Sequence, residues 1–338
     1  MCWLTPMKNL ISQLGTKTIE AVSMQFEALS VDRGRWRIWT NIAIVCLSIF
    51  AFPRHSIAQT QTYKVTTSHA EVVDKVGGGL LTLDGVFDQP ATLVVILGGS
   101  DGGYLSTKTP LVMDLLFSGH RVAPVADHGA TGTPKHLSEI SIDAIASRIA
   151  ALADTSSAAK GCVGIVGISK GGELTLLLAS LSDIGDVHVA ITPSDVVWQA
   201  SNISFSRKSS WTHSGEPLAF VKYPRFSPKT FTAIRDVTRA GGLHALALEK
   251  TKDIEPMRIP VERATTPILL QAGTEDTLWP TAEMSNRLMA RLATDKPDHK
   301  VELKTYKLDH FLIDHEKVRS DAVVFLNNHL ASTCKHKE

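Results

Sequence analysis

Three side chains in this sequence have the types and the order that nucleophilic catalysis needs. Ser169 lies in the stretch GISKGGE (residues 167–173), and Asp276 and His310 follow it along the chain. A serine hydroxyl is a weak nucleophile unless a histidine takes its proton and a carboxylate orients that histidine. The order serine, acid, histidine is typical of enzymes whose nucleophile lies on a strand-to-helix turn. We therefore expect Ser169 to be the nucleophile, Asp276 the acid and His310 the base.

The glycines around Ser169 match the backbone that such a turn requires. The apolar run at 163–167 predicts a strand, and the segment that starts at Lys170 predicts a helix. A sharp turn between them lifts the serine hydroxyl clear of the sheet, and flanking glycines permit its strained backbone. The helix N-terminus directs N–H groups at any anion that forms there. The alternative, a glycine-rich turn that only packs helix on strand, leaves the downstream partners unexplained.

Both downstream partners have rivals. Glu275 precedes Asp276 in the loop after an apolar strand, but one position earlier its side chain should point elsewhere. His315 lies at an expected helix start, and His299 precedes a strand, on the wrong edge of the sheet. His310 follows the last strand, where a histidine can reach the nucleophile from above. We therefore prefer Asp276 and His310.

A second glycine-rich loop, GGSDGG (residues 98–103), follows another apolar run. We expect the oxyanion to be held by the backbone N–H of Lys170 and by one N–H of this loop, from Ser100 or Asp101. A phosphate cradle is the competing interpretation, but the loop has neither the P-loop pattern nor the dinucleotide-binding spacing. The sequence therefore predicts no cofactor, and without a C-x-x-C pair it indicates no metal site.

The elements that must position these residues alternate between strand and helix. Six apolar runs predict strands, at Thr92–Leu97, Arg121–Val125, Val163–Gly167, Val187–Thr192, Pro267–Ala272 and Val301–Tyr306. Helices are expected near Pro110–Ser118, Ile142–Ala153, Lys170–Leu181, Ala282–Leu292 and Lys317–Leu330. Continuous apolar strands between helices are typical of a mostly parallel, doubly wound sheet in a three-layer α/β architecture. Residues 65–87 should add a small antiparallel strand pair.

Residues 193–266 interrupt this alternation. A connection of this length inside a domain is usually a lid or a binding segment, so we expect a lid-like excursion that covers the site. Its aromatic side chains could line an acyl pocket or form a local core, and the sequence leaves both open for Trp198, Phe205, Trp211, Phe220 and Phe226.

The N-terminal segment has the pattern of a secretory signal. Three arginines precede the apolar run Ile38–Phe52, and small residues follow it up to Ala58. We expect cleavage after Ala58, so that residues 1–58 are a leader, residues 59–338 are a single catalytic domain, and the protein is periplasmic or secreted. The run is short for a membrane span, which favours a cleaved signal. The alternatives are an uncleaved membrane anchor and translation from Met24.

The composition excludes several classes. The 338 residues carry 35 Lys and Arg against 34 Asp and Glu, a balance unlike that of nucleic-acid binders. A mean hydropathy of +0.04 is too low for a polytopic membrane protein. Four cysteines do not make a disulfide framework. Of the two outside the leader, Cys162 and Cys334, we expect free thiols, with a bond between them as the alternative in an oxidising compartment.

Several stretches match a known family in order over roughly residues 90–330. They are PKHLSEI (134–140), GISKGGE (167–173), SWTHSGEPL (210–218), IPVE (259–262) and GTEDTLWP (273–280). With them the chain resembles the catalytic domain of acyl-CoA thioesterases and bile-acid-CoA:amino-acid N-acyltransferases, an α/β-hydrolase group. The resemblance implies the same roles for Ser169, Asp276 and His310. Because the acyltransferase branch carries cysteine as nucleophile, the serine favours hydrolysis over conjugation.

Two departures from this family affect the expected substrate. Members that act on acyl-CoA commonly carry an N-terminal β-sandwich, for which the chain between Ala58 and the first core strand is too short. Coenzyme A thioesters are cytoplasmic, whereas the leader predicts export. We therefore expect a serine hydrolase of a small-molecule ester or thioester, with no nucleic-acid partner and membrane contact only if the leader stays uncleaved. The alternatives are an acyl-CoA thioesterase proper, an acyltransferase or a non-catalytic relative.

Overall fold

The predicted apolar strands form one sheet in a computed structural model of the chain. Six of them are parallel neighbours in the order β4-β3-β6-β7-β10-β11. Their bounds are β3 (Leu93–Leu97), β4 (Arg121–Val125), β6 (Val163–Ile168), β7 (Val187–Ile191), β10 (Ile268–Gly273) and β11 (Val301–Tyr306). β2 (Leu80–Asp84) pairs antiparallel with β4, and β1 (Lys64–Ser68) comes next in the order.

The structure describes residues 64–68, 80–84, 92–103, 109–155, 162–200, 207–235 and 241–334. Residues 66–338 form one compact unit. The expected leader, its apolar run Ile38–Phe52 and the cleavage position at Ala58 lie outside the described residues. They stay predictions.

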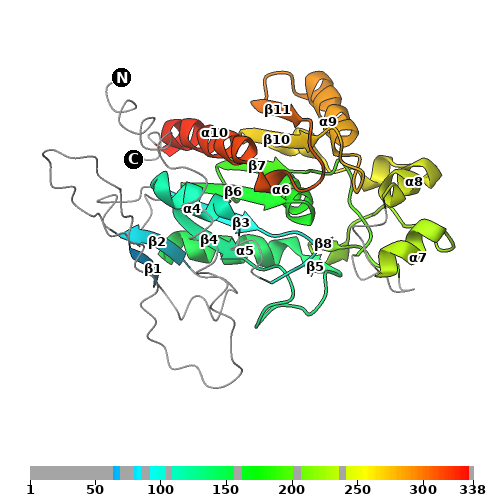
Figure 1. Ribbon diagram of the computed structural model, residues 1–338, viewed down its shortest axis with the longest axis horizontal. Helices are drawn as coiled ribbons and strands as arrows, with labels where there is room; N and C mark the ends of the chain where they lie inside the picture. The colour runs from blue at the N-terminus through cyan, green and yellow to red at the C-terminus, as the bar shows by residue number, and fades with distance from the viewer. Residues whose placement is uncertain are drawn as a thin grey trace, which may run out of the picture. The chain divides into compact units, whose positions relative to one another are not determined.

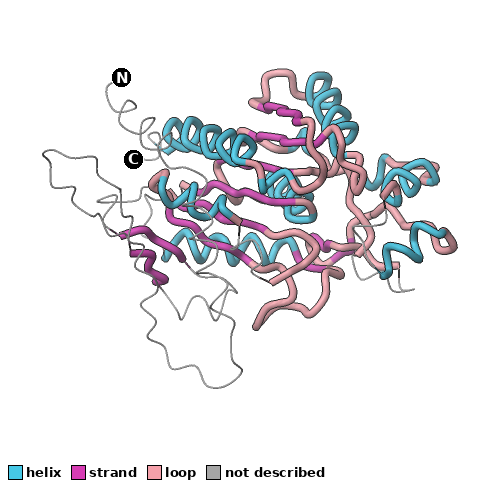
Figure 2. The backbone as a smooth tube through the Cα atoms, viewed as in Figure 1, coloured by secondary structure: helices cyan, strands magenta, loops and turns pink. Residues whose placement is uncertain are grey.

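Helices cover the sheet on both faces (Figures 1 and 2). Their bounds are α4 (Pro110–Phe117), α5 (Ile142–Thr155), α6 (Lys170–Leu181), α9 (Thr281–Asp295) and α10 (Glu316–Cys334). α4 packs with α10 on one face, and the buried faces of α5, α6 and α9 share a core with β3 and β6 on the other. In α5 this face consists of apolar residues three or four positions apart, namely Ile142, Ile145, Ile149 and Leu152. The prediction of a three-layer, mostly parallel sheet is confirmed.

The strand order explains where a site can form. From β3 the chain moves to β4 on one side, and it then returns to β6 on the other side of β3. The carboxyl ends of β3 and β6 therefore meet at a point where the order reverses, which is where open α/β sheets bind ligands. The loop at 98–103 leaves β3 at this point, and Ser169 directly follows β6.

The excursion at 193–266 is more structured than the sequence suggests. It contains β8 (Trp211–His213), β9 (Glu216–Pro217), α7 (Pro228–Arg235), α8 (Leu243–Lys250), and two short helices, η3 (Glu255–Met257) and η4 (Val261–Arg263). β8 pairs with β5 (Ile140–Ser141), which directly precedes α5, and with β9 in a small second sheet. α7 and α8 pack together at one end of the molecule (Figure 1).

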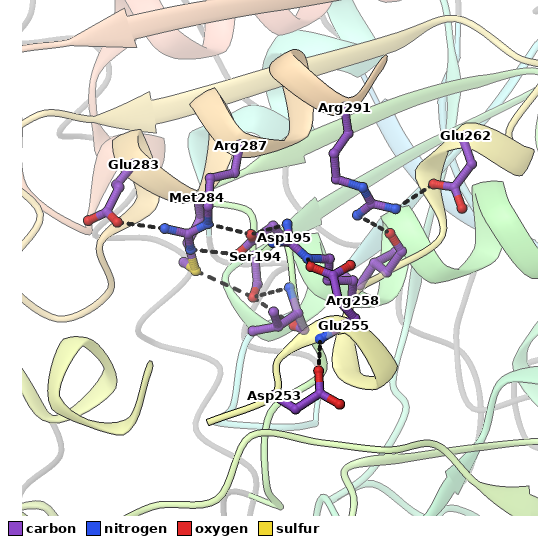
Figure 3. A network of polar contacts seen from close by, with 12 residues as sticks. Ser194, Asp195, Asp253, Glu255, Arg258, Glu262, Glu283, Met284, Arg287 and Arg291 are labelled. Carbon is purple, nitrogen blue, oxygen red and sulfur yellow. Dashed lines mark hydrogen bonds and ion pairs between the residues drawn. The ribbon is translucent and has the colours of Figure 1, made fainter. Parts of the chain in front are cut away.

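A network of ion pairs attaches both ends of the excursion to α9 (Figure 3). Arg287 of α9 donates two hydrogen bonds, of 2.6 and 2.9 Å, to the fully buried carboxylate of Asp195 near the start of the excursion. Arg291 of the same helix donates to Glu262 and to the carbonyl of Ile259 near its end. A bidentate arginine-carboxylate pair fixes direction as well as distance. The two ends of the excursion are therefore anchored on one helix.

Two further observations concern the described residues. Among the described residues, no helix is long and apolar enough to cross a membrane. Cys162 is disulfide-bonded, so the expectation of a free thiol at this position is wrong.

Candidate active site

Ser169 occupies a strained position between β6 and α6. Its backbone has φ 57° and ψ −114°, a combination that costs free energy in a residue with a side chain. The neighbouring glycines are required by contact: a Cβ on Gly167 would lie 2.0 Å from the carbonyl oxygen of Gly171. A Cβ on Gly171 would lie 2.4 Å from backbone carbonyls at the end of β3. The G-x-S-x-G spacing therefore lets strand, turn and helix pack backbone against backbone.

The three expected catalytic side chains form one hydrogen-bonded series. His310 Nδ1 lies 2.8 Å from Asp276 Oδ2, and His310 Nε2 lies 2.9 Å from Ser169 Oγ. Because a carboxylate only accepts, Nδ1 carries the hydrogen and Nε2 presents its lone pair to the serine hydroxyl. The side chain of Asp276 is fully buried and that of His310 is 8% exposed. The structure thus brings together all three residues that the sequence singled out.

The loop after β10 holds the Asp276 carboxylate from several sides. The backbone N–H groups of Leu278 and Trp279 donate to Oδ1, at 3.0 and 2.9 Å, and the hydroxyl of Thr281 donates to Oδ2 at 3.0 Å. These donors leave the carboxylate one orientation, with Oδ2 toward His310. The rival Glu275 is exposed and lies 3.9 Å from Lys307.

The rival histidines also lie apart from Ser169. His315 is exposed at the start of α10. The ring of His299 lies before β11, where Nε2 contacts the carbonyl oxygen of Thr266 at 2.7 Å.

The loop at 98–103 borders the nucleophile, as expected for an oxyanion-binding loop. A Cβ on Gly99 would lie 3.5 Å from Ser169 Cβ and 4.0 Å from its Oγ. The carbonyl oxygen of Ser100 faces His128, whose Nε2 lies 3.3 Å away. Lys170 is the first residue of α6, directly after Ser169. The roles of the Ser100 and Lys170 N–H groups stay predictions.

The side chain of Lys170 points into the core and forms a buried ion pair. Its Nζ lies 2.6 Å from Glu173 Oε2, and the two side chains are 3% and 0% exposed. Glu173 Oε1 accepts hydrogen bonds from the Trp198 backbone N–H at 3.0 Å and from Trp211 Nε1 at 2.7 Å. Burial raises the pKa of Glu173 and lowers that of Lys170. The charge of each residue counteracts the pKa shift that burial causes in its partner. This carboxylate joins the nucleophile helix to two separate points of the excursion.

An aromatic cluster packs behind His310. The ring of Trp279 lies 5.8 Å from that of His310 and 5.3 Å from that of His244, measured between centroids. Trp198 contacts His244 edge-on at 4.6 Å, and Tyr223 donates or accepts a 2.9 Å hydrogen bond at His244 Nε2. Burial, and then the nearby charge of His310, lower the pKa of His244 to about 3, so this ring is neutral at physiological pH. The cluster gives His310 a rigid, uncharged wall.

The aromatic residues of the excursion therefore serve different purposes. Trp198 and Trp211 are fully buried core residues, whereas Phe226 is 82% exposed. Phe205 lies outside the described residues. Phe220 lines a cavity of about 370 Å³ within the excursion.

Apolar and basic residues both line this cavity. Its remaining lining residues are Arg207, Lys222, Tyr223, Pro224, Ala247, Lys250, Thr251, Lys252, Asp253 and Met257. Within the described part of the chain, the four basic side chains of this lining form no ion pair. Tyr223 and Ala247 belong both to the cavity wall and to the cluster that contains Trp279. The described residues include no group of three or more side chains that could hold a metal ion.

A comparison with protein families identifies the chain. Residues 146–315, which include Ser169, Asp276, His310 and the excursion, match the family described as BAAT / acyl-CoA thioester hydrolase C terminal. The chain belongs to this family. Membership of this family supports the assignment of the chain as a hydrolase of the esterase or thioesterase type. It also confirms the resemblance seen in the sequence.

This family member is similar to several solved structures. An esterase from Pyrococcus furiosus, Pf2001, superposes with a TM-score of 0.51 at 14% identity, over 88% of this chain and 97% of that chain. A monoacylglycerol lipase from Paleococcus ferrophilus has a TM-score of 0.45 at 17% identity, over 72% of this chain and 97% of that chain. The likeness to the esterase shows an α/β-hydrolase fold. A search of curated proteins found no match.

Sequence reasoning missed two parts of this site. Glu173 was visible within the motif around Ser169, but its partners Trp198 and Trp211 are distant in sequence. Asp127 and His128 follow the strand β4 after one residue, Ala126, and a polar pair at the carboxyl end of a central strand was the available signal.

The buried pair predicts a strongly non-additive effect on stability. Lys170→Met and Glu173→Leu should each lower the free energy of unfolding by about 3–5 kcal/mol, because each leaves a buried charge without its partner. The double variant should lose clearly less than the sum of the two single losses. Urea unfolding measures all three. The exposed pair of Lys208 and Glu139 is the control, with single losses below about 1 kcal/mol and no coupling. Additive losses at Lys170 and Glu173 would contradict the interpretation.

Proposed function

We propose that this protein is a serine hydrolase that cleaves a carboxylic ester or thioester through an acyl-enzyme. The observation that carries the proposal is the hydrogen-bonded series of Ser169, His310 and Asp276 at the carboxyl edge of the sheet. Membership of a family of thioester hydrolases supports it. The expected nucleophile of this chain is a serine, whereas the resemblance implies a cysteine in the acyltransferases. The serine therefore favours water as the final acceptor of the acyl group.

The proposed reaction has two similar halves. Ser169 Oγ attacks the substrate carbonyl while His310 Nε2 takes its proton, and Asp276 stabilises the imidazolium that forms. N–H groups of Lys170 and of the loop at 98–103 hold the oxyanion. The intermediate collapses, His310 returns the proton to the leaving alcohol or thiol, and the acyl group stays on Ser169. Water then repeats the steps and releases the carboxylic acid.

Substitution at the three positions tests this mechanism. Ser169→Ala should remove turnover of p-nitrophenyl esters and acyl thioesters while the protein stays folded. Asp276→Asn should lower kcat by about 10³- to 10⁴-fold, because the imidazole loses its orienting acceptor. Glu275→Gln is the matched control, since its exposed side chain lies away from His310, and it should keep near-full activity. Full esterase activity of Ser169→Ala, with circular dichroism showing an intact fold, would exclude the proposal.

Export is part of the proposal. The apolar run at Ile38–Phe52 with its arginine flank has the pattern of a signal, and the disulfide at Cys162 is of a kind that is rare in reducing compartments. Cell fractionation with N-terminal mass determination tests it. We expect a periplasmic or secreted chain that begins after Ala58. A cytoplasmic or membrane-bound chain that retains residues 1–58 would refute export.

The basic cavity favours a second candidate, an acyl-CoA thioesterase. Coenzyme A is a polyanion, and the lining of the cavity includes four positive side chains against the single acid Asp253. Phe220 and Met257 add apolar surface beside them. The shared residue Tyr223 connects this cavity to the aromatic cluster behind His310.

Charge reversal at the cavity separates the two candidates. If acyl-CoA is the substrate, Lys250→Glu combined with Lys252→Glu should raise its KM about tenfold or more and leave kcat/KM for a neutral p-nitrophenyl ester unchanged. Added salt should weaken acyl-CoA turnover in the parent protein but not in the variant. Lys300→Glu is the control, because this exposed lysine precedes β11 at the opposite edge of the sheet. An unchanged KM for acyl-CoA would favour the ester hydrolase.

A further inference from the structure

A second histidine-aspartate pair lies next to the site, at residues that the proposed mechanism does not use. Asp127 and His128 follow the end of β4 after one intervening residue, Ala126, and β4 is the parallel neighbour of β3, so the pair lies beside the loop at 98–103. They are 4% and 5% exposed. Buried polar groups of this kind need partners, and the partners of His128 are specific.

Both ring nitrogens of His128 face oxygen atoms that only accept. Nδ1 lies 2.9 Å from Asp127 Oδ1, and Nε2 lies 3.3 Å from the carbonyl oxygen of Ser100. A neutral imidazole has one N–H, so it can satisfy only one of these contacts. The two contacts therefore favour an imidazolium, which donates at both nitrogens.

The loop at 98–103 is built around this ring. Gly103 donates its N–H to the carbonyl oxygen of His128 at 2.7 Å. Gly102 has φ +67°, and a Cβ at this position would lie 2.6 Å from His128 Nε2, so the ring packs directly against a bare glycine. Gly102 N–H in turn reaches the carbonyl oxygen of Gly99 at 3.4 Å, and Gly99 borders Ser169. The histidine thus contacts the loop at three residues, Ser100, Gly102 and Gly103.

Charges of alternating sign continue from this ring through the core. The charge of Asp127 acts on His128 and also favours the charged form of Lys170, which pairs with Glu173. Burial opposes the charge on the ring, but the hydrogen bond and charge of Asp127, then the Ser100 carbonyl and the charge of Asp101, outweigh it and raise the pKa of His128.

We propose that protonated His128 is a positioning residue that holds the oxyanion-binding loop in its active geometry. In a planar trans peptide the C=O and N–H point in opposite directions. By fixing the Ser100 carbonyl, His128 therefore fixes the direction of the next N–H, that of Asp101, and with it the curvature of the loop against Ser169. The inference rests on the proposed hydrolase function, because it assigns His128 to the same site.

The protonation state gives the activity an alkaline limit. His310 must be neutral to act as base, which limits activity on the acid side. His128 must be charged to hold the loop, so activity falls as pH rises through its raised pKa. The stability of the fold should follow the same trend. Because folding raises the pKa of His128, its protonation stabilises the fold fully below the unfolded histidine pKa of about 6.5. This stabilisation is lost as pH rises through the pKa of His128 in the folded chain.

Two glutamine variants test the role of His128 in catalysis. His128→Gln should lower kcat about 10- to 100-fold and change KM by no more than about twofold. This decrease in kcat is smaller than the decrease that removal of an oxyanion donor can cause. It should also remove the alkaline limb of the kcat profile, which lies above the ordinary histidine pKa of about 6.5.

His120→Gln is the matched control for a merely structural histidine. His120 precedes β4, is similarly buried, and contacts Thr92 Oγ1 at 2.6 Å and Asn327 Oδ1 at 2.8 Å. A neutral ring satisfies both contacts, since a hydroxyl can donate. This variant should lose stability but keep both limbs of the pH profile. If His128→Gln keeps the alkaline limb, the proposal is wrong.

A measurement without substrate separates this inference from the function on which it rests. In the ¹⁵N spectrum of the histidine-labelled full chain, the signals that His128→Gln removes should show both ring nitrogens mainly protonated at about pH 6.5, the ordinary histidine pKa. A His128 ring that is mainly neutral at about pH 6.5 in the folded chain would overturn the inference, whatever the activity. Retained hydrolysis in Ser169→Ala would instead overturn the function and leave the histidine result intact.

Discussion

The carboxylate of Glu173 is the contact on which the arrangement of the site depends. It is fully buried, and it uses one oxygen for Lys170 and the other for two donors in the excursion, Trp198 and Trp211. A charge placed so deeply is tolerated only with all of these partners in place. The nucleophile helix and the excursion are therefore not independent: the core can close only when both have reached their final positions.

The sheet topology determines which loops share this site. Parallel strands send their following loops to one edge, and the reversal at β3 brings the loops of β3 and β6 together. β10 and β11 deliver the acid and the histidine to the same edge. This is why the pattern of strands and following residues in the sequence was enough to predict that Ser169, Asp276 and His310 would meet.

Other features could not be predicted from local patterns. The pairing of β5 with β8 joins residues about seventy positions apart, and such short strands carry no periodicity. The contacts of His128 with the loop at 98–103 depend on the register of neighbouring strands. From the sequence, the aromatic residues of the excursion could line an acyl pocket or form a local core. Only their burial in the structure distinguishes the core residue Trp198 from the exposed Phe226.

The anchoring of the excursion on α9 has a consequence for how this family member can diversify. Arg287 holds Asp195 near one end, and Arg291 holds Glu262 near the other, while α7 and α8 lie between these attachments. The same helix begins just after the loop that carries Asp276. Insertions between the anchors that keep the contacts of Trp198 and Trp211 with Glu173 therefore leave the spacing of Ser169 and His310 intact, so the outer part of the excursion can diversify while the catalytic frame stays unchanged.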